Sequence, residues 1–202
     1  TVNFQNDPAA AGYTHEVRVT VPIDPGLAAQ SVQLGDIKIG NITVHVPADR
    51  GLFQGDFDFT QSNGFILRVS AGVDLKSRGA TWLLQAIDPL TGELLRDPTR
   101  GLLAPNDARG NGAGFVSYTI EANPDTPTGI KITAQASVVF DNTPPEETPA
   151  LVYTLDSAAP ITTLTVQPVA GTGNQLVRWS ASDDAGGSGV KTLSLYVAVD
   201  GG

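Results

Sequence analysis

Two neighbouring aspartates, Asp183 and Asp184, are the residues whose type and spacing best suit a specific chemistry. They open the segment Asp-Asp-Ala-Gly-Gly-Ser-Gly at 183–189, which combines carboxylates with flexible backbone carbonyls. Oxygen ligands of this kind suit a hard cation such as Ca²⁺. The segment lacks the ligand spacing and the final glutamate of an EF-hand loop. Two interpretations stay open: Ca²⁺ held by Asp183 and Asp184, and a turn whose glycines adopt positive φ.

The other polar residues form no convincing catalytic motif. His15 and His45 are the only histidines, and both lie in strand-like patterns. Asp56 and Asp58 are two residues apart on one expected strand, which places them on a single solvated face. The serines lie outside any Gly-x-Ser-x-Gly context, so a nucleophile elbow is not indicated. We therefore expect that the chain is not an enzyme.

Composition favours an all-β protein and argues against several classes of partner. The chain has 202 residues, 22 of them Gly and 14 Pro, a mixture typical of short strands joined by tight turns. The net charge of −9 disfavours nucleic acid and anionic membranes as partners. Cysteine is absent, no apolar run is long enough to insert into a membrane, and no signal peptide is visible. Methionine is absent too, so we expect a processed or excised piece of a longer chain.

Alternating apolar and polar residues predict an antiparallel β-sandwich at residues 1–156. Val17, Val19 and Val21 share one face of an expected strand, and residues 130–140 alternate as one continuous strand. The phase slips at residues 40–41, which predicts a β-bulge or a tight turn. Trp82 and Trp179 each lie in the apolar register of a strand, so we expect both in a core.

A long irregular segment interrupts the strands at residues 88–114. It is rich in Gly, Pro, Asn and Asp. Loops of this length are uncommon in compact domains and are often functional or packed as an Ω-type excursion. This segment is therefore the candidate ligand-binding loop.

The last part of the chain, residues 157–202, reads as the opening strands of an immunoglobulin-like sandwich. Such a domain needs about 7 strands and about 100 residues. A partial one leaves an apolar face uncovered and a strand edge unpaired. We expect an incomplete module that missing downstream sequence, the first domain or another chain must complete. A module that proteolysis or an expression boundary has cut short is the alternative that stays open.

Several short motifs occur in order along nearly the whole chain. They are Phe4-Gln-Asn-Asp-Pro8, Leu34-Gly-Asp-Ile37, Ala71-Gly-Val-Asp74, Ala86-Ile-Asp-Pro-Leu-Thr-Gly-Glu93, Gly101-Leu-Leu-Ala-Pro-Asn106, Gly114-Phe-Val-Ser-Tyr118, Val139-Phe-Asp141 and the stretch from Trp179 to Gly189. Together they resemble a recurring β-domain of very large secreted modular bacterial proteins, found upstream of immunoglobulin-like or fibronectin-like modules. The resemblance implies export to the cell surface and a scaffold or adhesive role, with no catalytic residues.

These observations predict a structural protein of a bacterial surface fibre, sheath or modular adhesin. Its partners would be neighbouring copies of itself or downstream modules of the same polypeptide. Assembly could proceed head-to-tail by strand complementation, in which main-chain hydrogen bonds provide affinity. The expected donor is Thr1, Val2, Asn3, Phe4 and Gln5, and the expected acceptor strand carries Leu193, Leu195, Val197 and Val199. The alternative is a carbohydrate-binding adhesin that uses the 88–114 loop.

Overall fold

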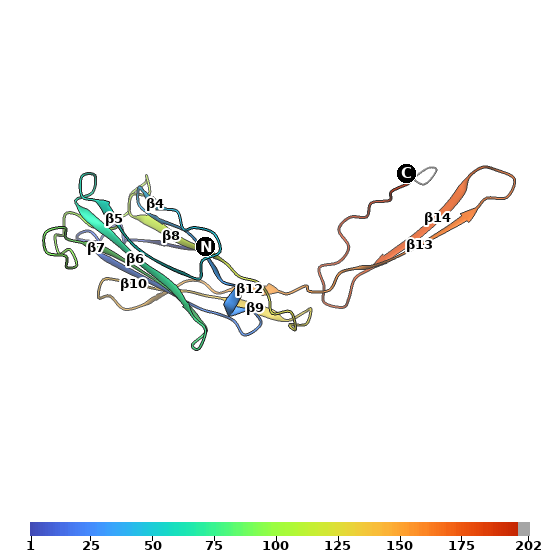
Figure 1. Ribbon diagram of the computed structural model, residues 1–202, viewed down its shortest axis with the longest axis horizontal. Helices are drawn as coiled ribbons and strands as arrows, with labels where there is room; N and C mark the ends of the chain where they lie inside the picture. The colour runs from blue at the N-terminus through green and yellow to red at the C-terminus, as the bar shows by residue number, and fades with distance from the viewer. Residues whose placement is uncertain (198–202) are drawn as a thin grey trace. The chain divides into compact units, whose positions relative to one another are not determined.

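The computed structural model describes residues 1–197, and its regular secondary structure consists almost entirely of antiparallel strands (Figure 1). The all-β prediction is confirmed. The chain divides into two compact units: residues 1–123 with 132–152 form the first, and residues 124–131 with the segment from 153 onward form the second. The sequence places the boundary at 156/157, whereas the structural division runs at 152/153.

The first unit contains a sheet of four strands. Its spatial order is β1 (Val2–Gln5), β8 (Ala113–Thr119), β3 (Gln33–Ile39) and β4 (Ile42–Val44). All three strand pairs are antiparallel. Strands β1 and β4 therefore form the two edges of this sheet.

The second sheet of this unit has six strands. Its two outer strands flank four inner strands, and all pairs of neighbouring strands are antiparallel. The order is β11 (Glu146–Glu147), β10 (Ser137–Phe140), β2 (Glu16–Pro22), β7 (Gly79–Ile87), β6 (Phe65–Asp74) and β5 (Leu52–Phe59).

One hydrophobic core lies between the two sheets. Val17, Val19 and Val21 are buried as the alternation predicts, and Trp82 is fully buried, which confirms its expected core position. The Trp82 ring packs 5.7 Å from the ring of Tyr118, which lies on the opposing sheet. Burial of this apolar surface is the main force that holds the sheets together.

The expected continuous strand at 130–140 is wrong in one respect, because the structure divides it into two. Strand β9 (Lys131–Ala134) pairs with β12 (Leu151–Thr154), whereas β10 pairs with β2 and β11. Ile132 and Val138 are both buried, so the alternation persists through the break. Side-chain periodicity reports which face is buried and carries no information about which strand lies alongside.

The phase slip at residues 40–41 is a tight turn between β3 and β4. Gly40 has φ of +55° there, a conformation that glycine adopts without steric cost. A short 3₁₀ helix, η1 (Ala29–Ser31), connects β2 to β3. Between β7 and β8 runs the long irregular segment that the sequence predicts. Its Leu95, Leu102 and Leu103 side chains are buried, so much of this segment is packed against the domain.

The described part of the second unit contains one β-hairpin of two eight-residue strands. They are β13 (Ile161–Pro168) and β14 (Gln175–Ser182), paired along their full length. The strand expected at 190–199 is absent over residues 190–197, and Val199 lies outside the described residues. A strand is defined by hydrogen bonds to a partner, and among the described residues none pairs with 190–197.

Candidate functional site

The β13–β14 hairpin has one apolar face and one polar face. Cross-strand partners put Leu164 opposite Trp179 and Val166 opposite Val177. Alternation places all four side chains on the same face, because neighbouring residues of a strand point to opposite sides. Thr165 and its partner Arg178 lie on the other face. The hairpin therefore has the side-chain pattern of a strand pair that belongs in a sandwich.

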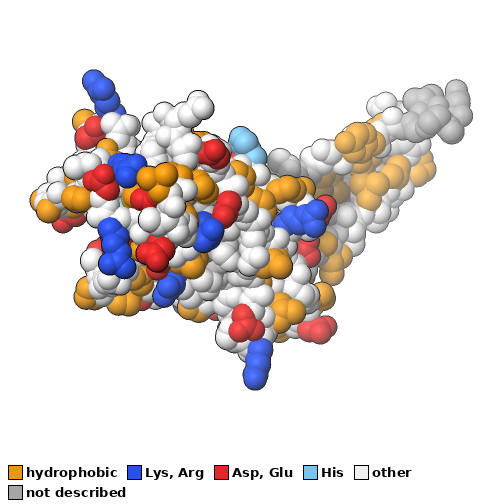
Figure 2. Space-filling view, turned by 60° about the vertical axis from the view of Figure 1, so that its left-hand side comes forward, with side chains coloured by type: hydrophobic (Ala, Val, Ile, Leu, Met, Phe, Trp, Pro, Cys, Tyr) orange, Lys and Arg blue, Asp and Glu red, His pale blue; other side chains and the backbone are white. Residues whose placement is uncertain are grey.

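No second layer covers this apolar face among the described residues. Leu164, Val166 and Trp179 have relative exposures of 55%, 53% and 57%. Figure 2 shows hydrophobic side chains, in orange, at the surface of the second unit. The expectation that Trp179 lies in a core is therefore wrong, because no sheet within residues 1–197 packs against this face of the hairpin. A two-stranded hairpin alone is at best marginally stable in water, so this face calls for a covering partner.

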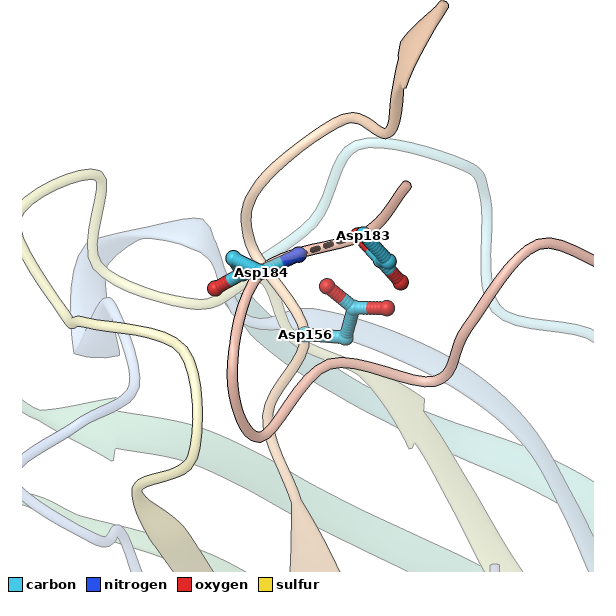
Figure 3. Close-up of side chains that lie close together, drawn as sticks. All are labelled: Asp156, Asp183 and Asp184. Carbon is cyan, nitrogen blue, oxygen red and sulfur yellow. Dashed lines mark hydrogen bonds between the residues drawn. The ribbon is translucent and has the colours of Figure 1, made fainter. Parts of the chain in front are cut away.

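Three aspartates of the second unit gather beside the hairpin's last strand. Asp183 and Asp184, the predicted pair, are joined by Asp156, and each can offer one oxygen within 4.8 Å of the others (Figure 3). Sequence inspection missed Asp156 because it lies 27 positions before Asp183 and no local spacing connects them. The cluster lies where the chain leaves β14.

Hydrogen bonds from the main chain hold this loop in place. The Ser188 N–H donates to Asp156 Oδ2 at 2.8 Å, and the Gly189 N–H donates to Asp183 Oδ2 at 2.7 Å. Hydrogen bonds from the Ser188 side chain and main chain lower the pKa of Asp156 below its ordinary value. The positive φ of Gly186 and Gly189 shows that the glycine-turn interpretation describes this loop correctly.

The same carboxylates have the chemistry that Ca²⁺ prefers, namely hard oxygen ligands at close spacing. Asp156 and Asp184 are exposed and Asp183 is half-buried, so solvent could complete a coordination shell. A loop that is already ordered by N–H donors does not require an ion. Ca²⁺ at Asp183 and Asp184 therefore stays a prediction.

The expected strand donor is already paired within its own chain. Val2 lies opposite Val116 and Phe4 opposite Gly114, in the β1–β8 ladder. Val2 and Phe4 are also buried in the core, and a Cβ at Gly114 would lie 2.6 Å from the Phe4 ring. Removing β1 would expose both side chains, at a cost of about 1.5–3 kcal/mol each. This arrangement argues against Thr1–Gln5 as a free donor.

The expected acceptor segment is exposed throughout its described part. Leu195 and Val197 have relative exposures of 48% and 79%, and Leu193 of 37%. The segment offers no ladder to accept a strand, since residues 190–197 pair with no strand in the described part of the chain. The alternation of apolar side chains along its sequence is nevertheless the pattern of a β-strand.

The two histidines contact different carboxylates and do not converge. His45 Nδ1 lies 3.0 Å from Asp36 Oδ2, and His15 Nδ1 lies 3.9 Å from Asp141 Oδ1. Asp141 has a structural role, because its Oδ1 accepts hydrogen bonds from the backbone N–H groups of His15 and Glu16.

Part of the 88–114 loop borders a shallow groove of about 400 Å³ on the outer side of the four-stranded sheet. Arg109 and Gly110 come from the loop, while Lys38 and Phe115 come from β3 and β8. The groove thus combines two cations with an aromatic ring. Neither Lys38 nor Arg109 has a carboxylate within ion-pair distance among residues 1–197.

Comparisons with known proteins give no family assignment. No protein-family model matches the chain, and searches of curated proteins and of solved structures found no match. The resemblance to a surface-protein β-domain therefore stays a prediction, as does the absence of enzyme activity. Within residues 1–197, no helix is long and apolar enough to cross a membrane.

Proposed function

We propose that the chain is a structural subunit of a bacterial extracellular fibre, in which copies of the chain associate through exposed β-elements. The observation that carries the proposal is the uncovered apolar face of the β13–β14 hairpin, with Leu164 and Trp179 at its centre. Contiguous exposed apolar surface on a folded protein is typical of an interaction site.

Three further features support a structural role. The first unit is a fully packed sandwich with a single core, which suits a rigid spacer. The second unit contains two exposed apolar elements, namely the apolar face of the β13–β14 hairpin and the segment 190–197. An acidic surface with a net charge of −9 favours solubility of the subunit before assembly.

Sedimentation velocity over a wide concentration range tests this function. We expect a concentration-dependent increase in mass, and we expect polar substitutions at Leu164 and Trp179 to suppress it. A contact between different patches on successive copies does not close, so it gives open filaments. A chain that stays monomeric at millimolar concentration would contradict the proposal.

The groove beside the 88–114 loop favours a second candidate function, binding of an anionic carbohydrate. Lys38 and Arg109 would attract the negative groups, and Phe115 offers an apolar surface. A glycan array probed with the chain tests this function. Binding that is lost when residues 104–112 are replaced, and also in Lys38→Gln/Arg109→Gln, would support the adhesin. If the chain binds no acidic glycan on the array, this second function is rejected.

A further inference from the structure

Strand β1 has a free edge whose main-chain groups can be assigned from the ladder. Antiparallel pairs alternate between residues bonded to the partner strand and residues whose N–H and C=O point away from it. The Asn6 N–H donates to the Gly112 oxygen, one step beyond the Gln5–Ala113 pair. Phe4 and Val2 are therefore the bonded positions, and the N–H and C=O of Asn3 and Gln5 point to the open side.

A slot of about 210 Å³ lies along this open side. Asn3, Phe4 and Gln5 form one wall, and residues of β10 and β11 form the other. Phe4 and Phe140 meet edge to face at 6.3 Å, so the slot has an apolar floor between the two sheets. The slot therefore combines an apolar surface with main-chain groups that have no partner among residues 1–197, as a strand-accepting site requires.

The far wall of the slot is acidic. Glu146 and Glu147 are exposed, and neither is within ion-pair distance of a cation in the described part of the chain. A basic residue on the incoming strand, placed near these two carboxylates, would favour binding of that strand in the slot.

Residues 190–197 of the second unit have the pattern that this slot would select. Lys191, Leu193, Leu195 and Val197 fall on one face by alternation, and the other face carries Thr192 and Ser194 together with Val190 and Tyr196. The segment has no strand partner among the described residues, and its apolar side chains are exposed. It is therefore strand-like in sequence and unpaired in the structure.

We propose that residues 190–197 of a second copy add to the free edge of β1. Leu193 and Leu195 face the apolar floor, Lys191 faces Glu146 and Glu147, and the even-numbered residues bond to the main chain of Asn3 and Gln5. In antiparallel pairing, directly bonded residues share a face, which matches polar Thr192 and Ser194 to the outer side of β1. This inference rests on the proposed function and reverses the donor and acceptor that the sequence indicates.

Proline scanning of the free edge tests the site in the full chain. Asn3→Pro removes an N–H that points away from β8, a position where an edge strand tolerates proline. The matched control is Gln54→Pro on edge strand β5. The Val73 N–H donates to the Gly51 oxygen, so the odd-numbered residues of β5 bond to β6. The main-chain N–H of Gln54 therefore also points away from its partner strand. We expect Asn3→Pro to weaken self-association at least tenfold by sedimentation and Gln54→Pro to leave it unchanged.

A charge exchange tests the same contact without proline. Glu146→Lys/Glu147→Lys and Lys191→Glu should each weaken self-association severalfold, and mixing the two variants should restore it, because each then supplies the complement of the other. Amide exchange should also show protection of Asn3 and Gln5 in the assembled wild-type chain.

The outcomes separate this inference from the proposed function. If hairpin-face variants abolish association while Asn3→Pro and Gln54→Pro behave alike, the strand site at β1 is wrong and the proposed function stands. If the wild-type chain is monomeric at all concentrations, both are wrong. Thermal unfolding of each variant shows whether a loss of association reflects a loss of fold.

Discussion

Leu164 and Trp179 lie directly opposite each other across the β13–β14 ladder, and both are more than half exposed. A cross-strand side-chain pair typically contributes only roughly 0.2–1 kcal/mol to the stability of a sheet. Here the pair faces outward with no opposing layer in the described structure. The pair therefore connects the fold of the hairpin to the proposed association between copies.

Replacing both residues of this pair with threonine should affect association far more than folding. The side chains are already exposed in the single chain, so Leu164→Thr/Trp179→Thr should change the free energy of unfolding by about 0.5 kcal/mol or less. Loss of a buried Trp contact at an interface typically costs 2 kcal/mol or more. Sedimentation should therefore show association weakened more than tenfold.

The control for this experiment is the polar face of the same hairpin. Thr165→Ser/Arg178→Ser alters the neighbouring pair without touching the apolar face. Equal loss of association in both double variants would show that the apolar face is not the contact surface.

Asp141 should be a stability determinant of the first unit. Its Oδ1 accepts two backbone hydrogen bonds, and its φ of +49° is unfavourable for most side chains. Asp141→Ala leaves two donors without a partner, so urea unfolding should show a loss of about 1–3 kcal/mol. Asp141→Asn keeps an acceptor and tolerates positive φ, and should cost clearly less. An alanine variant as stable as wild type would contradict this role.

The Ca²⁺ prediction can be tested by thermal unfolding with calcium and with chelator. A bound ion would stabilise the folded chain by about 2.7 kcal/mol when its concentration is 100 times the dissociation constant. Asp156→Asn and Asp183→Asn should abolish that effect, whereas Asp107→Asn, in an exposed loop of the first unit, should not. Identical unfolding curves with calcium and chelator would rule out this site.

The pKa of Asp156 gives a pH-dependent signature of the same loop. Hydrogen bonds from Ser188 lower that pKa in the folded state. Ionised Asp156 therefore stabilises the folded state above the ordinary pKa of aspartate, about 3.9. This stabilisation is lost as the pH falls through the lower pKa of the folded state. Carboxyl NMR titration should show the pKa of Asp156 rise in Ser188→Ala, and an unchanged value would contradict the assigned cause.

The sequence predicts faces of strands better than it predicts their partners. The burial of Val17, Val19 and Val21 follows from alternation alone, as does the solvated face of Asp56 and Asp58. The division of 130–140 into two strands could not be predicted, because it depends on neighbours remote in the sequence.

The candidate sites show the same limit. Asp183 and Asp184 are visible as a local pair, whereas Asp156 joins them only through the path of the chain. The assignment of residues 1–5 as donor failed to anticipate the β1–β8 ladder, since pairing with residues 113–116 leaves no local signal.

Quenching of tryptophan fluorescence is the most direct test of the central claim that the hairpin face is covered in the assembled state. The chain has two tryptophans, Trp82 fully buried and Trp179 with 57% exposed. At low concentration, acrylamide should quench the Trp179 emission strongly and that of Trp82 weakly. The account predicts that the quenchable fraction falls as the chain associates. A quenchable fraction that stays constant while the mass increases would show that the chains join elsewhere.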